Sequence, residues 1–378
     1  MGAEASRKIS ASSARSHTRK PIHNSFFTSV MFKTILLVFF GGVLAYAYQA
    51  MTPPPPKICG SSGGPPVTAP RIKLKDGRYL AYKEFGVPKE SAKHKIVYLH
   101  GFDSCRHDLS FESTLSAETI QSLGVYIVTF DRPGYGESDP HPKRTVKTMA
   151  QDVEQLADQL ELGSKFYVSG FSMGGEAVWT CLKYIPHRLA GAALIAPVVN
   201  YWWKSFPANM STEAYNLQFV QDQWSLRVAH YLPWLTYWWN TQKFFPSNSV
   251  IARSRAILSR EDNELLPRII SRKAENDAQV RQQGEYESLH RDMMVAFGNW
   301  EFDPMDLENV FPNGDGSVHL FTGDEDTLVP IKLQRFIVEH LPWLCYHELQ
   351  GSGHFFPFAD GMGDRIIKAL VSGRCDAS

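Results

Sequence analysis

A serine enclosed by glycines is the feature of this chain that most clearly indicates chemistry. Residues 167–179 read YVSGFSMGGEAVW, in which Ser172 follows an apolar run and precedes a helical pattern. Glycine loses more backbone freedom on folding than any other residue, so Gly170, Gly174 and Gly175 need a steric reason. At a tight strand-to-helix turn, side chains at such positions collide with neighbouring elements, and the serine hydroxyl stands exposed above the sheet. The spacing therefore predicts a nucleophilic serine.

A nucleophilic serine needs a base, and the base needs an acid that orients it. Where the nucleophile lies on such a strand-to-helix turn, the serine precedes the acid and the acid precedes the histidine along the chain. Residues 321–330, FTGDEDTLVP, place acids directly after an apolar strand. Residues 351–356, GSGHFF, place His354 in a glycine-flanked loop, and we expect it to be the base. The competing histidines lie at a helix end or in strand patterns: His340, His347 and His319.

The elements that must position these residues indicate an α/β fold. A hairpin is predicted over residues 71–86, on both sides of Asp76-Gly77. Strands that alternate with helices after it imply a mostly parallel sheet with helices on both faces. The expected strands lie at 95–100, 125–130, 165–170, 190–197, 319–323 and 345–349, and the expected helices at 148–160, 173–185, 331–340 and 362–371.

From about residue 70 to 375 the chain resembles the α/β-hydrolase fold superfamily, and it is similar to little-characterised, membrane-anchored plant members. The resemblance implies an α/β-hydrolase fold with an inserted helical lid. It implies Asp326 as the acid, with Asp324 and Glu325 as near alternatives, and an oxyanion hole formed by the backbone N–H groups of Phe102 and Met173. The motifs that carry it are YLHGF (98–102), FDRPGYGESDP (130–140), GFSMGG (170–175), GDEDTLVP (323–330) and GSGHF (351–355).

The nucleophile type predicts the reaction. Relatives that open epoxides or displace halides use aspartate, whereas serine with an oxyanion hole suits attack on an acyl carbonyl. We expect a serine hydrolase that cleaves a carboxylic ester. Acyl transfer to another alcohol and a ligand-binding receptor that retains the triad are the alternatives. No metal or organic cofactor is implied, because the triad supplies its own base and electrophile. His100, Asp131 and Arg132 are interpreted as residues that hold the fold.

The α/β alternation stops over residues 200–295, where we expect the lid. The core is accordingly expected in residues 69–199 and 296–375. Aromatic residues concentrate over 201–245. They predict an apolar wall above Ser172 or a surface that touches a membrane, where Trp and Tyr favour the interface, and hence a lipophilic acyl substrate. Alternatively, they only bury the lid against the core.

The N-terminus is organised differently. Residues 1–33 are basic and serine-rich, residues 34–50 carry no charge, and residues 51–68 form a Pro/Gly linker. With the apolar residues in front of it, the uncharged segment can cross a bilayer. We therefore expect a single-pass membrane protein with a transmembrane helix at 34–50 and a cytosolic N-terminus, which places the C-terminal domain on the lumenal or exoplasmic side. An endomembrane is favoured, and a chloroplast location is the alternative.

Several sequence features concern processing of the chain. A signal-peptidase site is suggested by Ala45-Tyr46-Ala47, and the Ser/Arg-rich start also resembles a transit peptide. Gly2 and Ser6 fit the N-myristoylation pattern. Asn209 begins an N-glycosylation sequon, which matters if the domain is lumenal.

The composition indicates which classes of partner the protein is expected to bind. The chain carries 39 basic and 39 acidic residues, so its formal charge is zero and nucleic acid is not expected as a partner. The expected partner is a small-molecule ester or lipid, and no oligomeric state is predicted. Five scattered cysteines without a CxxC pair predict buried thiols rather than a zinc site or a disulfide framework: Cys59, Cys105, Cys181, Cys345 and Cys375.

Overall fold

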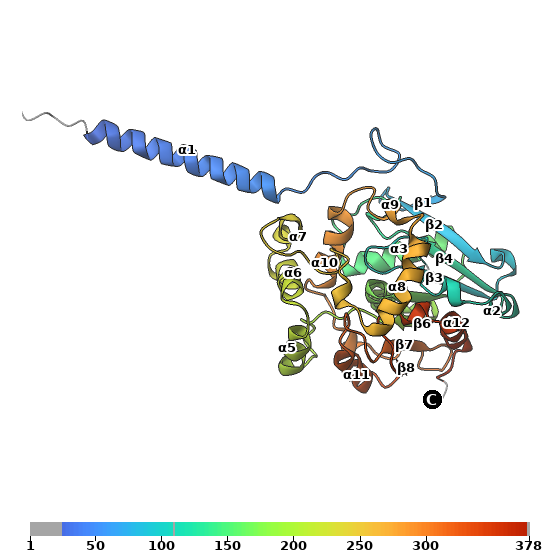
Figure 1. The fold of residues 1–378 in the computed structure, drawn as a ribbon. Coiled ribbons are helices and arrows are strands. Elements are labelled where there is room, and N and C mark those ends of the chain that lie inside the picture. Colours follow the sequence, from blue (N-terminus) through green and yellow to red (C-terminus); the bar gives the residue numbers. More distant parts are fainter. Residues whose placement is uncertain (1–24, 109, 376–378) are drawn as a thin grey trace, which may run out of the picture. The chain divides into compact units, whose positions relative to one another are not determined.

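The structure is a computed structural model that describes residues 25–108 and 110–375, in two compact units divided after Met51 (Figure 1). The second unit is built on an eight-stranded sheet with the order β1-β2-β4-β3-β5-β6-β7-β8. The pairs β1–β2 and β2–β4 are antiparallel, and all other neighbours are parallel. The strands are β1 (Arg71–Lys73), β2 (Tyr79–Gly86), β3 (His94–Leu99), β4 (Val125–Phe130), β5 (Phe166–Phe171), β6 (Leu189–Ile195), β7 (Val318–Gly323) and β8 (Leu344–Leu349).

Helices cover both faces of this sheet, which confirms the predicted fold class (Figure 1). Every residue of β4 and β7 is buried, as expected for parallel strands that are covered on both sides. The predicted hairpin is also present, with Gly77 at a φ of 93° in its turn. The helices that follow the sheet strands are α2 (Ala117–Leu123), α3 (Val146–Gln159), α4 (Met173–Tyr184), α11 (Ile331–His340) and α12 (Met362–Ser372).

Between β6 and β7 the chain forms a helical insertion, in the region where the predicted strand–helix alternation stops. Part of its aromatic content packs on the core, because Tyr201, Trp203 and Phe206 are buried in the main hydrophobic cluster. The helices of the insertion are α5 (Ala208–Asn216), α6 (Val220–Tyr231), α7 (Thr236–Thr241), α8 (Arg260–Lys273), α9 (Asp277–Val280) and α10 (Arg291–Ala296).

Much of the segment expected to be a Pro/Gly linker is bound to the α/β domain. The N–H of Lys57 donates to the carbonyl of Gln283 at 2.8 Å, and the N–H of Cys59 donates to its side-chain oxygen at 3.1 Å. Further along, the N–H of Thr68 donates to the carboxylate of Glu137 at 2.7 Å. These buried or half-buried partners come from distant parts of the sequence, so composition alone does not reveal them.

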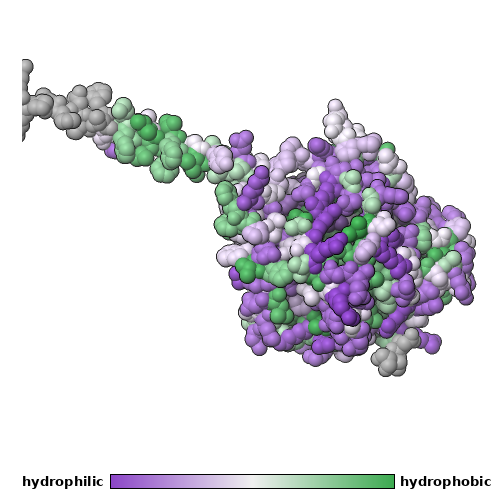
Figure 2. Space-filling model, viewed as in Figure 1, coloured by the Kyte–Doolittle hydropathy of each residue, from purple (hydrophilic) through white to green (hydrophobic). Residues whose placement is uncertain are grey.

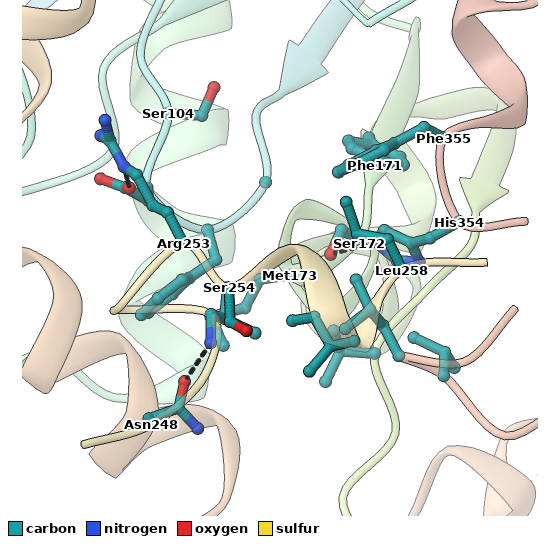
Figure 3. A pocket seen from close by; sticks show the side chains of 18 of the residues that line it. Ser104, Phe171, Ser172, Met173, Asn248, Arg253, Ser254, Leu258, His354 and Phe355 are labelled. Atoms are coloured by element: carbon teal, nitrogen blue, oxygen red, sulfur yellow. Dashed lines mark hydrogen bonds and ion pairs between the residues drawn. The ribbon is translucent and has the colours of Figure 1, made fainter. Parts of the chain in front are cut away.

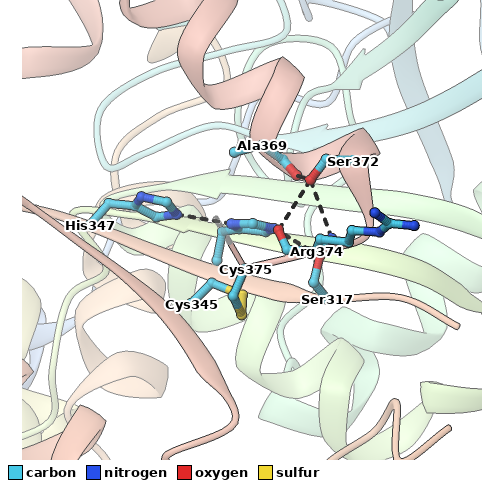
Figure 4. Close-up of a disulfide and its surroundings, with 8 residues drawn as sticks. Ser317, Cys345, His347, Ala369, Ser372, Arg374 and Cys375 are labelled. Carbon is cyan, nitrogen blue, oxygen red and sulfur yellow. Dashed lines mark hydrogen bonds between the residues drawn. A yellow bond between two sulfur atoms is a disulfide. The ribbon is translucent and has the colours of Figure 1, made fainter. Parts of the chain in front are cut away.

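The prediction that all five cysteines are thiols is wrong. Cys345 and Cys375 form a disulfide with a Cα–Cα distance of 5.1 Å (Figure 4). Cys345 lies in β8, and the chain turns at Gly373, with a φ of 67°, after α12 to bring Cys375 beside it. The 30-residue separation carries no local signal of this contact. The other three cysteines are free and buried, as expected.

The first unit contains helix α1 (Ser25–Met51), which includes the uncharged segment 34–50. Its part Ser29–Met51 contains an 18-residue window with a mean hydropathy of 2.0 that is not buried in the structure. The helix is therefore long and apolar enough to cross a membrane, a property that a signal sequence near the N-terminus shares. The features noted at Gly2 and Ser6 lie outside the described residues.

Candidate active site

Ser172 occupies a strained turn between β5 and α4. Its φ of 54° and ψ of −118° lie in a region that side chains rarely adopt, and its N–H is fixed by a 2.8 Å hydrogen bond to the carbonyl of Ile195. A Cβ at Gly170 would lie 2.2 Å from the carbonyl oxygen of Gly174, and a Cβ at Gly174 would lie 2.1 Å from that of Leu99. The glycines are therefore required by close backbone approach, for the reason inferred from the sequence.

The structure brings the three sequence-predicted side chains into one hydrogen-bonded chain, of which Figure 3 shows Ser172 and His354. Ser172 Oγ lies 3.0 Å from His354 Nε2, and His354 Nδ1 lies 2.7 Å from Asp326 Oδ2. The second carboxylate oxygen of Asp326 accepts the N–H groups of Leu328 and Val329, both at 2.8 Å. All three side chains are almost fully buried. The geometry suits transfer of a proton from the hydroxyl to the imidazole.

The competing residues have other partners. Asp324 accepts the N–H of Ser352 at 3.3 Å. His319 Nδ1 lies 2.9 Å from His347 Nε2 in the neighbouring strand. The Nδ1 atom of His340 contacts the carbonyl of Phe336 in its own helix. Within residues 25–108 and 110–375, no group of three or more His, Cys, Asp or Glu side chains could hold a metal ion.

The loop that carries His354 is held by the start of α8 in the insertion. Glu261 accepts the N–H of Gly353 at 2.6 Å, and Asp262 accepts the N–H of Phe355 at 2.6 Å. Burial by itself lowers the pKa of His354, but the carboxylate of Asp326, through its charge and hydrogen bond, and that of Asp262 raise the pKa above its ordinary value. Sequence reasoning missed Glu261 and Asp262, because the charged helix pattern does not say what the helix contacts.

Two backbone N–H groups near Ser172 have no protein acceptor among the described residues: those of Phe102 and Met173. Met173 is the first residue of α4, and the N-terminus of a helix has unpaired N–H groups and carries the positive end of the helix dipole. Gly101 lies against the serine, since a Cβ at Gly101 would be 3.3 Å from the Ser172 Cβ. Both predicted donors also line the cavity described next. Their placement suits an oxyanion on a carbonyl attacked by Ser172.

A cavity of about 550 Å³ opens beside Ser172 and His354. The insertion contributes an apolar lining to this cavity that is mostly aliphatic, with Tyr201 and Phe297 as its aromatic members. In Figure 3, Ser172 and His354 lie on one side of the view, and Ser104 and Arg253 on the other. The large aliphatic and methionine side chains that the insertion contributes are Leu226, Val250, Ile257, Leu258, Leu266, Ile269, Ile270 and Met293.

Charged side chains also line the cavity, and several of them form ion pairs. Arg253 pairs with Asp103 at 2.8 Å, and Lys273 pairs with Asp108 at 2.5 Å. These side chains line the cavity together with the apolar ones. A bound molecule therefore meets both hydrocarbon and charged side chains, among them these ion pairs.

Comparison with known proteins identifies the class to which this fold and site belong. The family model for the α/β hydrolase fold matches residues 96–360, and the chain belongs to this family. The chain is similar to protein ABHD14A of Rattus norvegicus, with 28% identity over 178 residues, which cover 46% of this chain and 72% of the relative. A non-heme chloroperoxidase of Streptomyces lividans is 27% identical over 128 residues, which span 34% of this chain but only 44% of the relative.

Solved structures show the same fold. A thermophilic esterase from Thermogutta terrifontis aligns with a TM-score of 0.50 and 18% identity, covering 80% of this chain and 97% of the esterase. A structure described as a non-heme bromoperoxidase, BpoC, from Mycobacterium tuberculosis aligns with a TM-score of 0.55 and 17% identity, covering 80% of this chain and 98% of that protein. At such identities the likeness concerns the fold alone.

Proposed function

We propose that this α/β hydrolase is a serine esterase that cleaves a carboxylic ester with a lipophilic acyl group. The observation that carries the proposal is the hydrogen-bonded chain from Ser172 through His354 to Asp326, at 3.0 and 2.7 Å, beside two unpaired N–H groups. Serine hydrolases use this arrangement to attack acyl carbonyls.

The mechanism follows from the positions of the atoms. Ser172 Oγ attacks the ester carbonyl while His354 Nε2 takes its proton, and Asp326 stabilises the imidazolium that forms. The negative charge on the carbonyl oxygen is met by the N–H groups of Phe102 and Met173. The imidazolium then protonates the departing alcohol and leaves an acyl-enzyme. Water attacks this ester with His354 as base, and Ser172 is released with the carboxylic acid.

The lining of the cavity supports a lipophilic acyl group. The insertion places eight large aliphatic or methionine side chains around the cavity beside Ser172, so we assign it the role of a lid. Burying a methylene of the substrate there is favourable by about 0.8 kcal/mol. Hydrocarbon chains of esters are therefore better partners for this wall than polar groups.

The test of the proposed function is repeated turnover. Purified protein is incubated with p-nitrophenyl octanoate in excess, alone and with added glycerol or methanol as acceptors. An esterase releases nitrophenol and octanoic acid over many cycles. Predominant formation of the new ester would favour the acyltransferase, and saturable binding without turnover would favour the receptor.

The activity should fall on the acid side with a midpoint above about pH 6.5, the ordinary pKa of histidine. The raised pKa of His354 keeps the imidazole protonated to higher pH, and the protonated ring cannot accept the Ser172 proton. Replacing Asp262→Asn removes one charge that raises this pKa, so the midpoint should move to lower pH. Profiles of kcat/KM against pH measure the acid-side midpoint in the wild type and in Asp262→Asn. An unchanged midpoint in the variant, or a wild-type midpoint below pH 6.5, contradicts the assignment.

The exposed face of the lid supports a location at a bilayer. Outside α1, all but three of the exposed large hydrophobic side chains in the described residues lie within residues 217–245, and Figure 2 shows hydrophobic side chains over α6 and α7. The acid in this stretch, Asp222, is buried, whereas Lys243 is exposed, which suits a lipid surface. These exposed side chains are Leu217, Phe219, Val220, Trp224, Tyr231, Leu232, Trp234, Phe244 and Phe245.

We propose that α1 anchors the protein with the α/β domain on the lumenal side. The Cys345–Cys375 disulfide supports this side, because disulfides persist in oxidising compartments. Asn209 of the glycosylation sequon is exposed in α5, where it is accessible to modification.

The protein is therefore expected to stay in the membrane pellet after washing with alkaline carbonate and to be released by detergent. An apolar helix that spans the bilayer resists carbonate, because burial of its side chains in hydrocarbon does not depend on charge. Immunoblots of pellet and supernatant make the measurement. Full release by carbonate would show that the helix is cleaved or does not span.

A further inference from the structure

One guanidinium holds the two carbonyl groups that precede Phe102. Arg132 donates from Nε to the carbonyl of His100 and from Nη2 to that of Gly101, both at 3.0 Å. The N–H of Arg132 also donates to His100 Nε2 at 3.0 Å, so the ring proton is on Nδ1, which donates to the Gly101 carbonyl at 2.8 Å. Burial and the charge of Arg132 lower the pKa of His100, which keeps this ring neutral.

These contacts set the direction of the Phe102 N–H. In a planar trans peptide, the carbonyl of one residue and the N–H of the next point in opposite directions. The Gly101 carbonyl faces Arg132, so the Phe102 N–H points away from Arg132 and has no acceptor among the described protein atoms. If this peptide rotated, the oxyanion would meet a carbonyl dipole of the wrong sign instead of a donor.

Arg132 is in turn held by the lid. Asp292 of α10 accepts from Nη1 of Arg132 at 2.8 Å and from Nη2 at 2.6 Å. Tyr135 donates its hydroxyl to the same carboxylate at 2.7 Å, and Arg144 lies 2.9 Å from it. All of these side chains are buried, and a buried charge that loses its partner is strongly destabilised. The next residue of α10, Met293, lines the cavity.

We propose that the Asp292–Arg132 pair is a positioning device through which the seated lid aims the Phe102 N–H at the oxyanion. The inference rests on the serine-esterase function proposed above. Neither residue touches the substrate. Because α10 presents Asp292 to Arg132 and Met293 to the cavity, occupation of the cavity and completion of the oxyanion hole favour the same position of the lid.

The test exchanges Arg132→Lys. Lysine keeps the charge but lacks the planar fork that binds two carbonyls and a carboxylate at once. For p-nitrophenyl octanoate, kcat should fall by about 10- to 100-fold with little change in KM, because the oxyanion contact forms only in the transition state. The inhibition constant of an octyl trifluoromethyl ketone, which forms a tetrahedral oxyanion on serine, should rise by a similar factor. Asp292→Asn should act in the same direction.

The matched control is Arg106→Lys. Arg106 is as buried as Arg132, at 3% exposed, and pairs with Asp131 at 2.5 Å and Glu137 at 2.8 Å, but it makes no contact with Gly101. This variant should lose thermal stability while kcat and ketone affinity stay near wild type.

The possible results separate the two proposals. Equal losses of kcat in Arg106→Lys and Arg132→Lys, or a rise in KM alone, would show that Arg132 acts only on the fold. Unchanged kcat and ketone affinity in a folded Arg132→Lys protein would also overturn the inference. A wild-type protein that neither turns over esters nor binds the ketone would instead contradict the esterase function itself.

Discussion

Ser172→Ala, His354→Ala and Asp326→Asn are each expected to lower kcat by on the order of 10⁴-fold. Ser172→Ala removes the nucleophilic oxygen, and His354→Ala removes the base. In Asp326→Asn the neutral amide cannot stabilise the imidazolium as the carboxylate does, which lies 2.7 Å from His354 Nδ1. Each change is small and leaves the surrounding backbone contacts in place, so the midpoint of thermal unfolding should stay near that of the wild type. Steady-state hydrolysis of p-nitrophenyl octanoate and thermal unfolding by circular dichroism measure the two quantities.

The matched control for the acid is Asp324→Asn. Asp324 lies two residues away in the same loop, but its carboxylate accepts the N–H of Ser352 at 3.3 Å rather than a histidine nitrogen. We expect this variant to keep kcat within a few-fold of wild type. Near-normal turnover in Asp326→Asn together with a large loss in Asp324→Asn would transfer the role of the acid to Asp324.

The second large effect is a rise of kcat/KM with acyl length. Each methylene buried in the aliphatic cavity beside Ser172 should add about 0.8 kcal/mol, or about fourfold in kcat/KM. Six added methylenes, from acetyl to octanoyl, should therefore raise kcat/KM by on the order of 10³-fold before the chain outgrows the cavity. A series of p-nitrophenyl esters from acetyl to palmitoyl measures this slope.

Two variants test whether the acyl chain binds in this cavity. Leu226→Trp fills part of the lining and should move the optimum to shorter esters. Trp234→Ala removes an exposed lid side chain that does not line the cavity, and it should leave the optimum unchanged. A steady preference for acetyl over medium and long chains would contradict a lipophilic acyl substrate.

The sequence predicts the sheet well where local and global signals agree. The central parallel strands are buried on both faces, so runs such as residues 125–130 are apolar throughout and easily recognised. The turn at Ser172 is also predictable, because Gly170 and Gly174 are fixed by close backbone contacts within one supersecondary unit. The order of Asp326 and His354 along the chain follows from the positions of the strands that precede them.

Other features depend on contacts between distant segments and leave no pattern in the sequence. The pair of Arg132 and Asp292 joins residues 160 positions apart, and their types alone indicate only charged side chains. The disulfide requires the chain after α12 to return to β8. The aromatic residues of the lid divide between core contacts, as for Trp203, and an exposed face, as for Trp234. Periodicity in the sequence does not distinguish side chains of the core from those of the exposed face, because large apolar residues occur in both.

The central claim is that Ser172 is an activated nucleophile, and active-site labelling tests it most directly. The folded protein is treated with a fluorophosphonate, and the modified residue is located by mass spectrometry of its peptides. We predict a single adduct on Ser172 that is suppressed by excess octanoate ester and absent from Ser172→Ala. A folded wild-type protein that is not labelled, or an adduct that persists in Ser172→Ala, would contradict the claim.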